Sequence, residues 1–359
     1  MKTIAFVDAT SRTLPYNYFF IKAIAEHYKV DVYCSRPRAE SVFFSSLSTL
    51  PNVRLIELNT NRANRAFGLL SIARMYCTLL WRRSSYTAIH IQWSVVPLLE
   101  YVFWRLLRNK IVYTIHNHSP HGSASETYRP FLRLASIARA VVFVSPSTCA
   151  KFVNEQDQRL ASKSHTLAIG AMPAIIEPAH SQKIFRGELK TLIFFGSVKQ
   201  YKGLDFLPAC MPAIIKRGIA LEVYGSFGAK HSELCKELRD SGASVTDKYM
   251  HDQELHELLT ASGSAIVLPY SRATQSAVLY TALHYQIPIL ASDSGDNGAF
   301  LRNENMAELS FAYGDVASFS RSLDCLIDTY SIVEKHMLEA AAKYNWRYPI
   351  EQLRTIYEA

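Results

Sequence analysis

The sequence predicts an α/β protein with two doubly wound domains. Short apolar runs of strand length alternate with helical patterns along most of its 359 residues. In the clearest example, segment 265–295, an apolar run ends at Pro269 and a polar loop follows. A helical pattern then begins at Ala277, and a second apolar run covers 287–291. Strand, loop, helix and strand form half of a nucleotide-binding domain, and phosphate groups bind at such a loop.

The first half of the chain has a regular β-α-β rhythm. Strands are expected at residues 3–8, 30–34, 53–58, 87–92, 111–116 and 140–145, and helices at 18–27, 66–81, 96–107 and 129–138. This alternation predicts a parallel sheet with helices on both faces. The pattern breaks around 172–182, which contains Pro173 and Pro178 and is interpreted as a linker between domains.

The second half restarts the same pattern. Strands are expected at 190–195, 220–225, 265–268 and 287–291, and helices from about Leu204 and at 232–241, 253–262, 316–335, 336–344 and 348–357. We therefore expect an N-terminal domain of residues 1–178, a C-terminal domain of residues 179–340, and a C-terminal helical segment of residues 341–359.

The charge is divided unevenly between the two halves. Residues 1–180 hold 21 Lys and Arg against 10 Asp and Glu, whereas the remainder holds 18 against 21. This asymmetry predicts an anionic partner for the first half: nucleic acid, an acidic membrane surface or a phosphorylated substrate. The six cysteines have no paired metal-type spacing, and the N-terminus does not read as a signal peptide. No apolar stretch reaches the roughly 20 residues of a membrane span. The scattered cysteines favour buried, reduced thiols, so we expect a cytoplasmic protein.

Two loops have the composition of phosphate-binding sites. In the first, Gly196 ends a strand and allows close approach of a ligand, and Lys199 and Lys202 follow as mobile cations. In the second, small residues at 274–278 leave the N–H groups of a helix start open. The alternatives are a turn with solvated lysines, and Ser276 as a simple N-cap.

These motifs resemble those of retaining glycosyltransferases of family 4, whose GT-B architecture has two Rossmann-like domains facing a cleft. Residues 196–203 are similar to the family's Gly-Arg-Leu-x-x-x-Lys-Gly motif, and residues 281–288 stand in the place of its Glu-Ala-Met-Ala-x-Gly-x-Pro. Residues 114–117 resemble its Thr-Val-His-Asp segment, and 140–145 its Val-x-x-Val-Ser strand. Asn345-Trp346, followed by Leu353 and Tyr357, resembles the terminal helix that crosses back onto the first domain.

The sequence also departs from the family pattern. Ala273 and Thr281 occupy the positions of two glutamates, and Ser197 replaces the motif arginine. Residues 10–13 (Thr-Ser-Arg-Thr) stand where the family has a Gly-Gly loop. The loop resembles that of a subgroup in which Gln275 and backbone amides bind the donor.

The resemblance implies a site for a nucleotide-diphosphate sugar, which is a substrate, with no cofactor and no metal. It assigns catalytic roles to Lys199 and Lys202, because neutralising the departing diphosphate is the main electrostatic task. It also assigns one to His116, which in the family faces the donor sugar and helps to position it. The implied donor-binding residues are Gly196, Ser197, Tyr224, Gly225, His251, Glu254, Pro269, Thr274, Gln275, Ser276, Ala277, Val278 and Thr281. The implied acceptor side contains Asp8, Arg12 and Asn117.

Other interpretations of these residues remain open. Glu254 also suits the first turn of a helix. His116 suits a structural role, and His116, His118 and His121 have a spacing that permits a metal site.

Residues 54–110 suggest a second partner. They contain nine Lys and Arg, including Arg82 and Arg83, and the segment 66–81 combines basic, aromatic and aliphatic residues. This composition suits a membrane interface with anionic lipids, although an ordinary helix packed on the sheet is the alternative. No nucleic-acid module is recognisable. We therefore expect peripheral association with the inner face of the membrane and a lipid-linked or saccharide acceptor in bacterial surface polysaccharide synthesis. The rivals are a catalytically degenerate GT-B binding protein and an inverting GT-B transferase.

Overall fold

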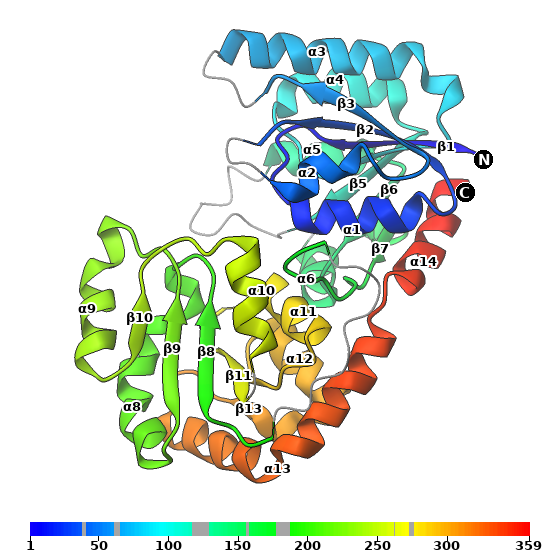
Figure 1. Ribbon diagram of the computed structural model, residues 1–359. Helices are drawn as coiled ribbons and strands as arrows, with labels where there is room; N and C mark the ends of the chain where they lie inside the picture. Colours follow the sequence, from blue (N-terminus) through cyan, green and yellow to red (C-terminus); the bar gives the residue numbers. More distant parts are fainter. Residues whose placement is uncertain are drawn as a thin grey trace. The chain divides into compact units, whose positions relative to one another are not determined.

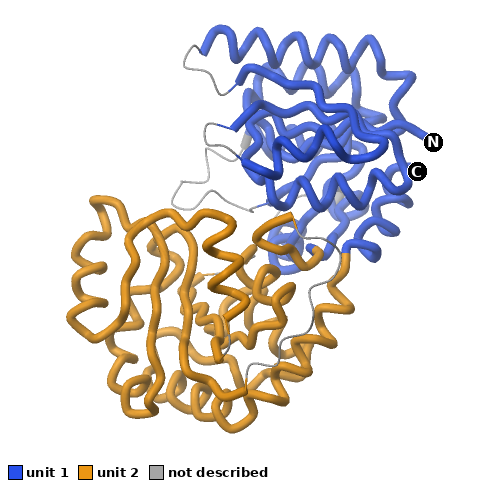
Figure 2. The backbone as a smooth tube through the Cα atoms, viewed as in Figure 1, with its two compact units in different colours: residues 1–169, 346–359 blue, residues 170–345 orange. Residues whose placement is uncertain are grey.

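The computed structural model of the protein describes residues 1–37, 41–60, 65–116, 129–155, 158–176, 187–261, 263–272 and 276–359. The chain forms two compact units (Figure 2). Unit 1 comprises residues 1–169 and 346–359, and unit 2 comprises residues 170–345. Each unit contains a parallel sheet whose strands alternate with helices, which confirms the predicted α/β fold class.

Unit 1 is built on a sheet whose described strands run in the order β3-β2-β1-β4-β5-β6-β7 (Figure 1). The strands are β1 (Thr3–Asp8), β2 (Lys29–Ser35), β3 (Val53–Leu58), β4 (Ala88–Ile91), β5 (Ile111–Ile115), β6 (Ala140–Phe143) and β7 (Ser164–Thr166). The helices are α1 (Leu14–Ile24), α2 (Val42–Leu47), α3 (Arg65–Trp81), α4 (Pro97–Leu107), α5 (Arg129–Ile137), α6 (Pro146–Glu155), α7 (Gln158–Ala161) and α14 (Arg347–Glu358), with a 3-10 turn, η1 (Arg83–Ser85).

Helices cover both faces of this sheet. On one face, Tyr76 of α3, Trp104 of α4 and Leu134 of α5 are fully buried in a core shared with the strands. On the other face, Phe20 of α1 and Tyr357 of α14 both pack edge-on against His90 of β4. The apolar interior of the unit thus extends through the sheet and includes the C-terminal helix.

Unit 2 is built on a sheet in the order β10-β9-β8-β11-β12-β13. Its strands are β8 (Thr191–Phe195), β9 (Ala220–Tyr224), β10 (Ser244–Thr246), β11 (Ser264–Leu268), β12 (Ile289–Ser292) and β13 (Ser310–Phe311). Its helices are α8 (Leu207–Lys216), α9 (Ser232–Asp240), α10 (Asp252–Thr260), α11 (Ala277–His284), α12 (Gly295–Asn303) and α13 (Val316–Lys343). Short 3-10 turns are η3 (Gln200–Lys202), η4 (Leu204–Phe206), η5 (Ala229–His231) and η6 (Ala307–Leu309).

The strand order reverses beside the first strand of each sheet. In unit 1 the reversal lies between β1 and β4, and in unit 2 between β8 and β11. At such a switch point the loops that follow the two central strands diverge to opposite faces of the sheet, which leaves a crevice at their carboxyl ends. The loops after β1, β4, β8 and β11 are therefore the places to look for ligand-binding residues.

The observed elements differ from the predicted ones in several places. The expected helix 18–27 begins earlier, at Leu14, because Pro15 suits a helix's first turn. The two helices expected at 316–335 and 336–344 are the single helix α13. The sequence patterns did not predict α2, α6, α7, α12, β7, β10 and β13, all of which are short or lack a clear apolar period.

The units divide the chain at 169/170 and 345/346, whereas the sequence patterns placed the divisions at 178/179 and 340/341. Hydrogen bonds explain the difference. The N–H of Ala171 donates to the Tyr344 carbonyl at 2.7 Å, and that of Met172 donates to the Tyr280 carbonyl at 3.2 Å. The stretch that begins at residue 170 and the stretch that ends at residue 345 are therefore bonded within unit 2. Much of the expected linker, residues 177–182, lies outside the described residues.

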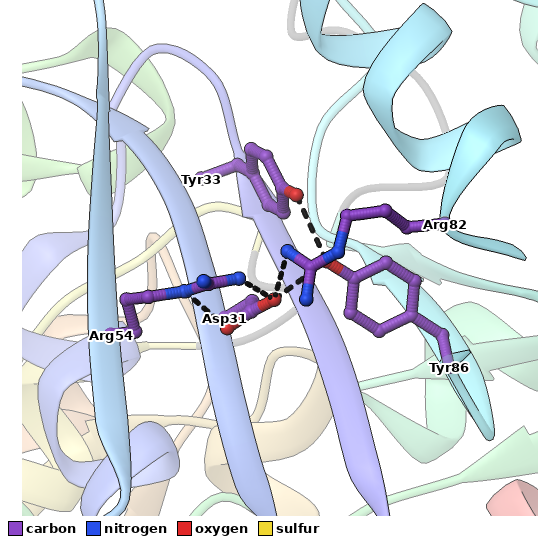
Figure 3. Close-up of polar contacts among 5 residues, drawn as sticks. All are labelled: Asp31, Tyr33, Arg54, Arg82 and Tyr86. Carbon is purple, nitrogen blue, oxygen red and sulfur yellow. Dashed lines mark hydrogen bonds and ion pairs between the residues drawn. The ribbon is translucent and has the colours of Figure 1, made fainter.

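A buried carboxylate connects several elements of unit 1 (Figure 3). Asp31 of β2 accepts hydrogen bonds from Arg54 Nε at 2.8 Å and Arg54 Nη2 at 2.5 Å. Arg82 Nη1 and the Tyr86 hydroxyl donate to its Oδ2 at 3.0 and 2.6 Å, and the Tyr33 and Tyr86 hydroxyls are 2.9 Å apart. This cluster joins β2 to β3 and to the chain between α3 and β4. Arg82 therefore has a structural partner and does not belong to a free basic surface.

Replacing Asp31 with alanine is expected to destabilise unit 1 by about 3–5 kcal/mol, because a half-buried Arg82 and a buried Tyr86 would lose their shared acceptor. Glu57→Ala is the matched control on β3. Its pair with Arg36 is exposed, so we expect a loss of less than about 1 kcal/mol. Urea unfolding followed by circular dichroism measures both changes. Equal losses of unfolding free energy in the two variants would show that the Asp31 cluster stabilises unit 1 no more than an exposed ion pair does.

Candidate functional site

The loop after β1 is held in place by a buried carboxylate. Asp8 is fully buried, and its side chain accepts hydrogen bonds from the Asn17 amide at 2.7 Å and from the backbone N–H groups of Thr10 and Thr13 at 3.4 Å each. Burial raises the pKa of Asp8, and these hydrogen bonds oppose that shift. The structure thus gives Asp8 a role in shaping this loop, and its assignment to the acceptor side stays a prediction.

The same loop makes a tight turn without glycine. Ser11 has a φ of +53°, and its N–H donates to the Asp8 carbonyl at 3.0 Å while its hydroxyl donates to the Ser35 carbonyl. A positive φ costs a non-glycine residue about 1–2 kcal/mol, which these two bonds offset. Beyond the turn, Arg12 is exposed, and its guanidinium carbon lies 4.9 Å from the centre of the Trp93 ring. The loops after β1 and β4 are therefore in contact.

His116, which follows β5, lies in an aromatic setting beside these loops. Its ring stacks on Trp93 at a centroid distance of 4.4 Å and meets the edge of Tyr16 at 5.6 Å. Burial, together with the nearby charge of Arg12, lowers the pKa of His116 to about 3. His116 is therefore neutral at physiological pH and acts through hydrogen bonding rather than through a positive charge.

A chain of buried hydrogen bonds sets which ring nitrogen of His116 carries the proton. The Gln92 amide oxygen lies 2.9 Å from His116 Nε2, so this nitrogen donates. The Gln92 amide nitrogen and the Thr114 hydroxyl donate to His90 Nε2 at 3.3 and 2.7 Å. His90 Nδ1 then donates to the Tyr357 hydroxyl at 2.5 Å. In this arrangement, which rests on the amide orientation of Gln92, Nδ1 of His116 is a hydrogen-bond acceptor.

In unit 2 the loop after β8 brings a glycine, a lysine and a helix start together. Gly196 has a φ of +116°, and a β-carbon at this position would lie 3.0 Å from Lys202 Nζ and 3.9 Å from Val278 Cγ2. Val278 belongs to the first turn of α11, which follows the second predicted loop. The two candidate phosphate loops thus meet at the switch point of the sheet, with Ser197 and Lys199 exposed beside them.

Lys202 is a buried cation. Its side chain is 7% exposed, and Nζ lies 5.6 Å from the ring centre of Phe194 and 5.8 Å from that of Tyr270. Burial and the neighbouring Lys199 lower the pKa of Lys202 to about 8. Among the described residues no carboxylate forms an ion pair with Lys202. A buried ammonium of this kind favours an anion, which would supply the missing partner.

Close backbone contacts hold the loops of this site together. Gly203 has a φ of +65°, and a β-carbon there would lie only 2.0 Å from the Pro269 carbonyl oxygen, in the loop after β11. A β-carbon at Gly225, after β9, would lie 2.2 Å from the Gly196 carbonyl oxygen. The N–H of Ser271 also donates to the Tyr201 carbonyl at 2.9 Å. The loops after β8, β9 and β11 therefore pack backbone against backbone.

The start of α11 has no side-chain cap from Ser276. Ser276 precedes the helix and is 5% exposed, and its hydroxyl lies 3.2 Å from that of Tyr270 rather than capping the first turn. The first N–H groups of a helix have no partner inside it, so those near Ala277 and Val278 suit an anion. The Thr281 hydroxyl donates to the Ala277 carbonyl at 3.1 Å. Ala273, Thr274 and Gln275 lie outside the described residues.

Tyr224 and Glu254 have protein partners. The Tyr224 hydroxyl donates to Glu222 at 2.7 Å. Glu254 pairs with Lys248 at 2.8 Å and accepts from the N–H of His251 at 3.3 Å in a capping box at the start of α10. The hydrogen bond from Lys248 is the main reason that the pKa of Glu254 is lowered. This is the first-turn role that the sequence left open, and contact of His251 and Glu254 with a nucleotide base stays a prediction.

Sequence patterns did not single out three residues that the structure places at these loops: Gln92, Trp93 and Tyr270. Gln92 and Trp93 directly follow β4, a strand at the switch point, and Tyr270 follows β11. Polar and aromatic residues just after a strand at the switch point of a parallel sheet indicate a ligand-binding loop, and this pattern could have identified them. Asn117, His118 and His121 lie outside the described residues. Within the part of the chain that the structure describes, no group of three His, Cys, Asp or Glu side chains is arranged for a metal.

Comparisons with protein families cover most of the chain. Residues 189–329 match the family described as Glycosyl transferases group 1, and residues 16–159 match Glycosyltransferase Family 4. No curated protein matches the sequence closely enough to count as a relative.

Several solved structures share the fold. HepE of Anabaena, solved in complex with UDP and glucose, is 14% identical with a TM-score of 0.73, and the match covers 99% of each chain. Sucrose-phosphate synthase of Thermosynechococcus elongatus is 17% identical with a TM-score of 0.69, over 99% of this chain and 98% of that one. WaaG, a glycosyltransferase involved in lipopolysaccharide biosynthesis, is 11% identical with a TM-score of 0.62, over 99% of each chain.

The contact between Gly203 and Pro269 yields a stability prediction. Gly203→Ala is expected to cost about 3 kcal/mol, of which 1–2 come from the positive φ and the rest from the overlap with Pro269. Gly218→Ala is the matched control, because its φ is +69° but nothing lies within 4 Å of the added carbon. We expect it to cost only the backbone part, about 1–2 kcal/mol. Thermal unfolding of both variants tests this, and equal losses would contradict the close approach.

Proposed function

Because this chain is a GT-B glycosyltransferase of the family 4 type, we propose that it transfers a hexose from a nucleoside-diphosphate sugar to a lipid-linked or saccharide acceptor. The bond between the anomeric carbon and the diphosphate oxygen breaks, and a bond from that carbon to an acceptor hydroxyl forms. The diphosphate leaves with the electron pair, and the acceptor hydroxyl loses its proton. Binding charge that develops on the diphosphate is therefore the main task of the site.

The single observation that carries the proposal is the buried cation of Lys202, which forms no ion pair among the described residues and lies near the start of α11. Lys202, the exposed Lys199 and the first N–H groups of α11 supply positive charge from the loop after β8 and from a helix start near it. The glycine at 196 leaves room there for a phosphate oxygen. With two lysines and a helix start in these positions, the reaction needs no metal.

We assign His116 to contact with the donor sugar, following the family resemblance. The hydrogen-bond chain through Gln92 leaves Nδ1 of His116 as an acceptor, and its low pKa keeps the ring neutral. A neutral acceptor nitrogen suits a sugar hydroxyl, which donates a proton to it. Retention of the anomeric configuration and a place in bacterial surface polysaccharide synthesis complete the proposal. The involvement of WaaG in lipopolysaccharide biosynthesis supports this setting by analogy.

A catalytically degenerate binding protein is the second candidate. The observation in its favour is Thr281, which stands where the family has a glutamate and whose hydroxyl is bound to the Ala277 carbonyl. An inverting transferase is a third candidate, because the two glutamate positions hold no carboxylate.

Donor hydrolysis and calorimetric binding with a panel of UDP- and GDP-sugars separate these candidates. HepE was solved with UDP-glucose, so UDP-sugars come first. Turnover supports the transferase, and nucleotide binding without turnover in the presence of acceptor lipids supports the degenerate protein. Absence of both would overturn the proposal. NMR of the product's anomeric proton distinguishes retention from inversion.

The pKa of Lys202 predicts how donor affinity depends on pH. The ammonium loses its proton as the pH rises through about 8, so the affinity for UDP should fall above that pH. Lys202→Arg keeps its charge at high pH and should remove this dependence. Calorimetry between neutral and alkaline pH measures the effect, and a wild-type affinity that stays flat up to pH 10 would contradict it.

Removing the charge altogether tests the same residue at neutral pH. Lys202→Met should lower turnover at least about tenfold, in line with the loss of one donor to a developing anion. Lys335→Met, which alters an exposed lysine on α13, is the control and should leave turnover unchanged. Unchanged kinetics in Lys202→Met would remove this residue from the site.

A further inference from the structure

Helix α3 is apolar on the face that points away from the core of unit 1. Its inner face is buried and consists of Gly68, Ile72, Met75, Tyr76 and Leu79. On the opposite face the side chains of Phe67, Leu70 and Trp81 are 63%, 64% and 84% exposed. Their spacing of 3 and 11 residues keeps them on one side of a helix with 3.6 residues per turn. A helix that is apolar on both sides usually has a partner on each.

Helix α4 has the same character. Glu100, Trp104 and Leu107 are its buried residues. Leu98, Val102 and Leu106 follow one another at intervals of four residues on the outer side, and they are 81%, 57% and 60% exposed. This is a continuous apolar stripe along the length of α4.

The two stripes belong to one surface. Helices α3 and α4 contact each other on the same face of the sheet (Figure 1), and the rings of Tyr76 and Phe103 stack between them at 5.2 Å. We call the six exposed side chains, Phe67, Leu70, Trp81, Leu98, Val102 and Leu106, the α3–α4 surface. Soluble proteins rarely leave so many large apolar side chains together in water unless they bind something.

The exposed charged residues of α3 and α4 are all positive. Arg65, Arg74 and Arg105 are exposed on these two helices. From residue 59 to residue 116 the sequence contains one acidic residue, Glu100. Its carboxylate is 2% exposed and accepts hydrogen bonds from Ser94, Tyr76 and the N–H of Val95. Within the described residues of α3 and α4, no exposed carboxylate balances the arginines, which favours an anionic partner.

We propose that the α3–α4 surface binds an anionic phospholipid bilayer, with its apolar side chains among the upper acyl chains and its arginines at the phosphates. Apolar residues flanked by arginines are the composition of helices that lie in the plane of a membrane. Within the described part of the chain, no helix is long and apolar enough to cross one. The inference rests on the proposed function, because membrane binding would bring unit 1 to a lipid-linked acceptor. A second copy of the chain fits less well, because two such surfaces would bring arginines against arginines.

Vesicle flotation tests the apolar part of the proposal. The full chain should bind vesicles of equimolar phosphatidylcholine and phosphatidylglycerol. Leu70→Gln/Leu106→Gln should weaken this binding about tenfold or more, since two exposed side chains lose their apolar burial. Ile215→Gln/Ile332→Gln is the matched control. It changes two isoleucines of unit 2 that are 56% and 51% exposed, and it should bind as the wild type does.

The role of the arginines is tested with a separate variant and with uncharged vesicles. Arg74→Gln/Arg105→Gln should weaken binding to the mixed vesicles about tenfold and have little effect on the weaker binding to pure phosphatidylcholine. Trp81 provides a direct reading of insertion. Its fluorescence, taken as the difference between wild type and Trp81→Phe, should shift to the blue with the mixed vesicles. Because all the altered side chains are exposed, circular dichroism should show intact folding.

Three outcomes would overturn the proposal: no binding of the wild type to mixed vesicles, equal binding of Leu70→Gln/Leu106→Gln, or a stable dimer in solution that this variant dissociates. The last result would assign the surface to a second copy. Donor hydrolysis measured without vesicles keeps this test separate from the proposed function. Loss of vesicle binding with unchanged hydrolysis is the expected result, whereas absent hydrolysis with intact vesicle binding would count against the transferase alone.

Discussion

The reversal of strand order beside the first strand of each sheet is the constraint on which both units depend. In unit 2 it separates the loops after β8 and β11, and the close approach of Gly203 to the Pro269 carbonyl then holds these loops together. In unit 1 the same reversal separates the loops after β1 and β4, where Arg12 lies over Trp93. The residues of these loops are distant in sequence, and the parallel register of the strands brings them to one edge of the sheet.

Buried polar groups in the two units differ in whether the described residues give them hydrogen-bonding or charged partners. Asp8, Asp31 and His90 have their hydrogen-bonding atoms matched by neighbouring side chains or backbone, so they stabilise the fold around them. Lys202 is also buried, but its described surroundings are aromatic rings and a glycine. An uncompensated cation costs stability in the empty protein. This cost is the reason for the proposal that a phosphate binds Lys202, because an anion would remove it.

Sequence patterns located the long, strongly periodic elements well. Strands β1 and β3 were predicted with their observed bounds, and α3 to within one residue. Helix α12 was missed because Gly295-Asp296-Asn297-Gly298 has no apolar period, and β13 is too short for one. At the candidate site, Gly196 and Lys202 were found through motif spacing and lie together in the structure. Gln92 and Trp93 were missed, because a polar residue and an aromatic one at the end of a strand have no pattern of their own.

By itself the sequence determined that the chain has two α/β halves, that the first is basic, and that glycine and lysine follow β8 at the spacing of a phosphate loop. These properties are local, since they depend on periodicity, composition and distances along the chain. Only the tertiary structure decided that Arg82 forms an ion pair with Asp31 and that Glu254 caps a helix. It also decided that one apolar face of α3 is buried in the core whereas the other is exposed. A charge or an apolar side chain looks the same in sequence whether it is paired, buried or exposed, because its partners come from elements that folding alone brings near.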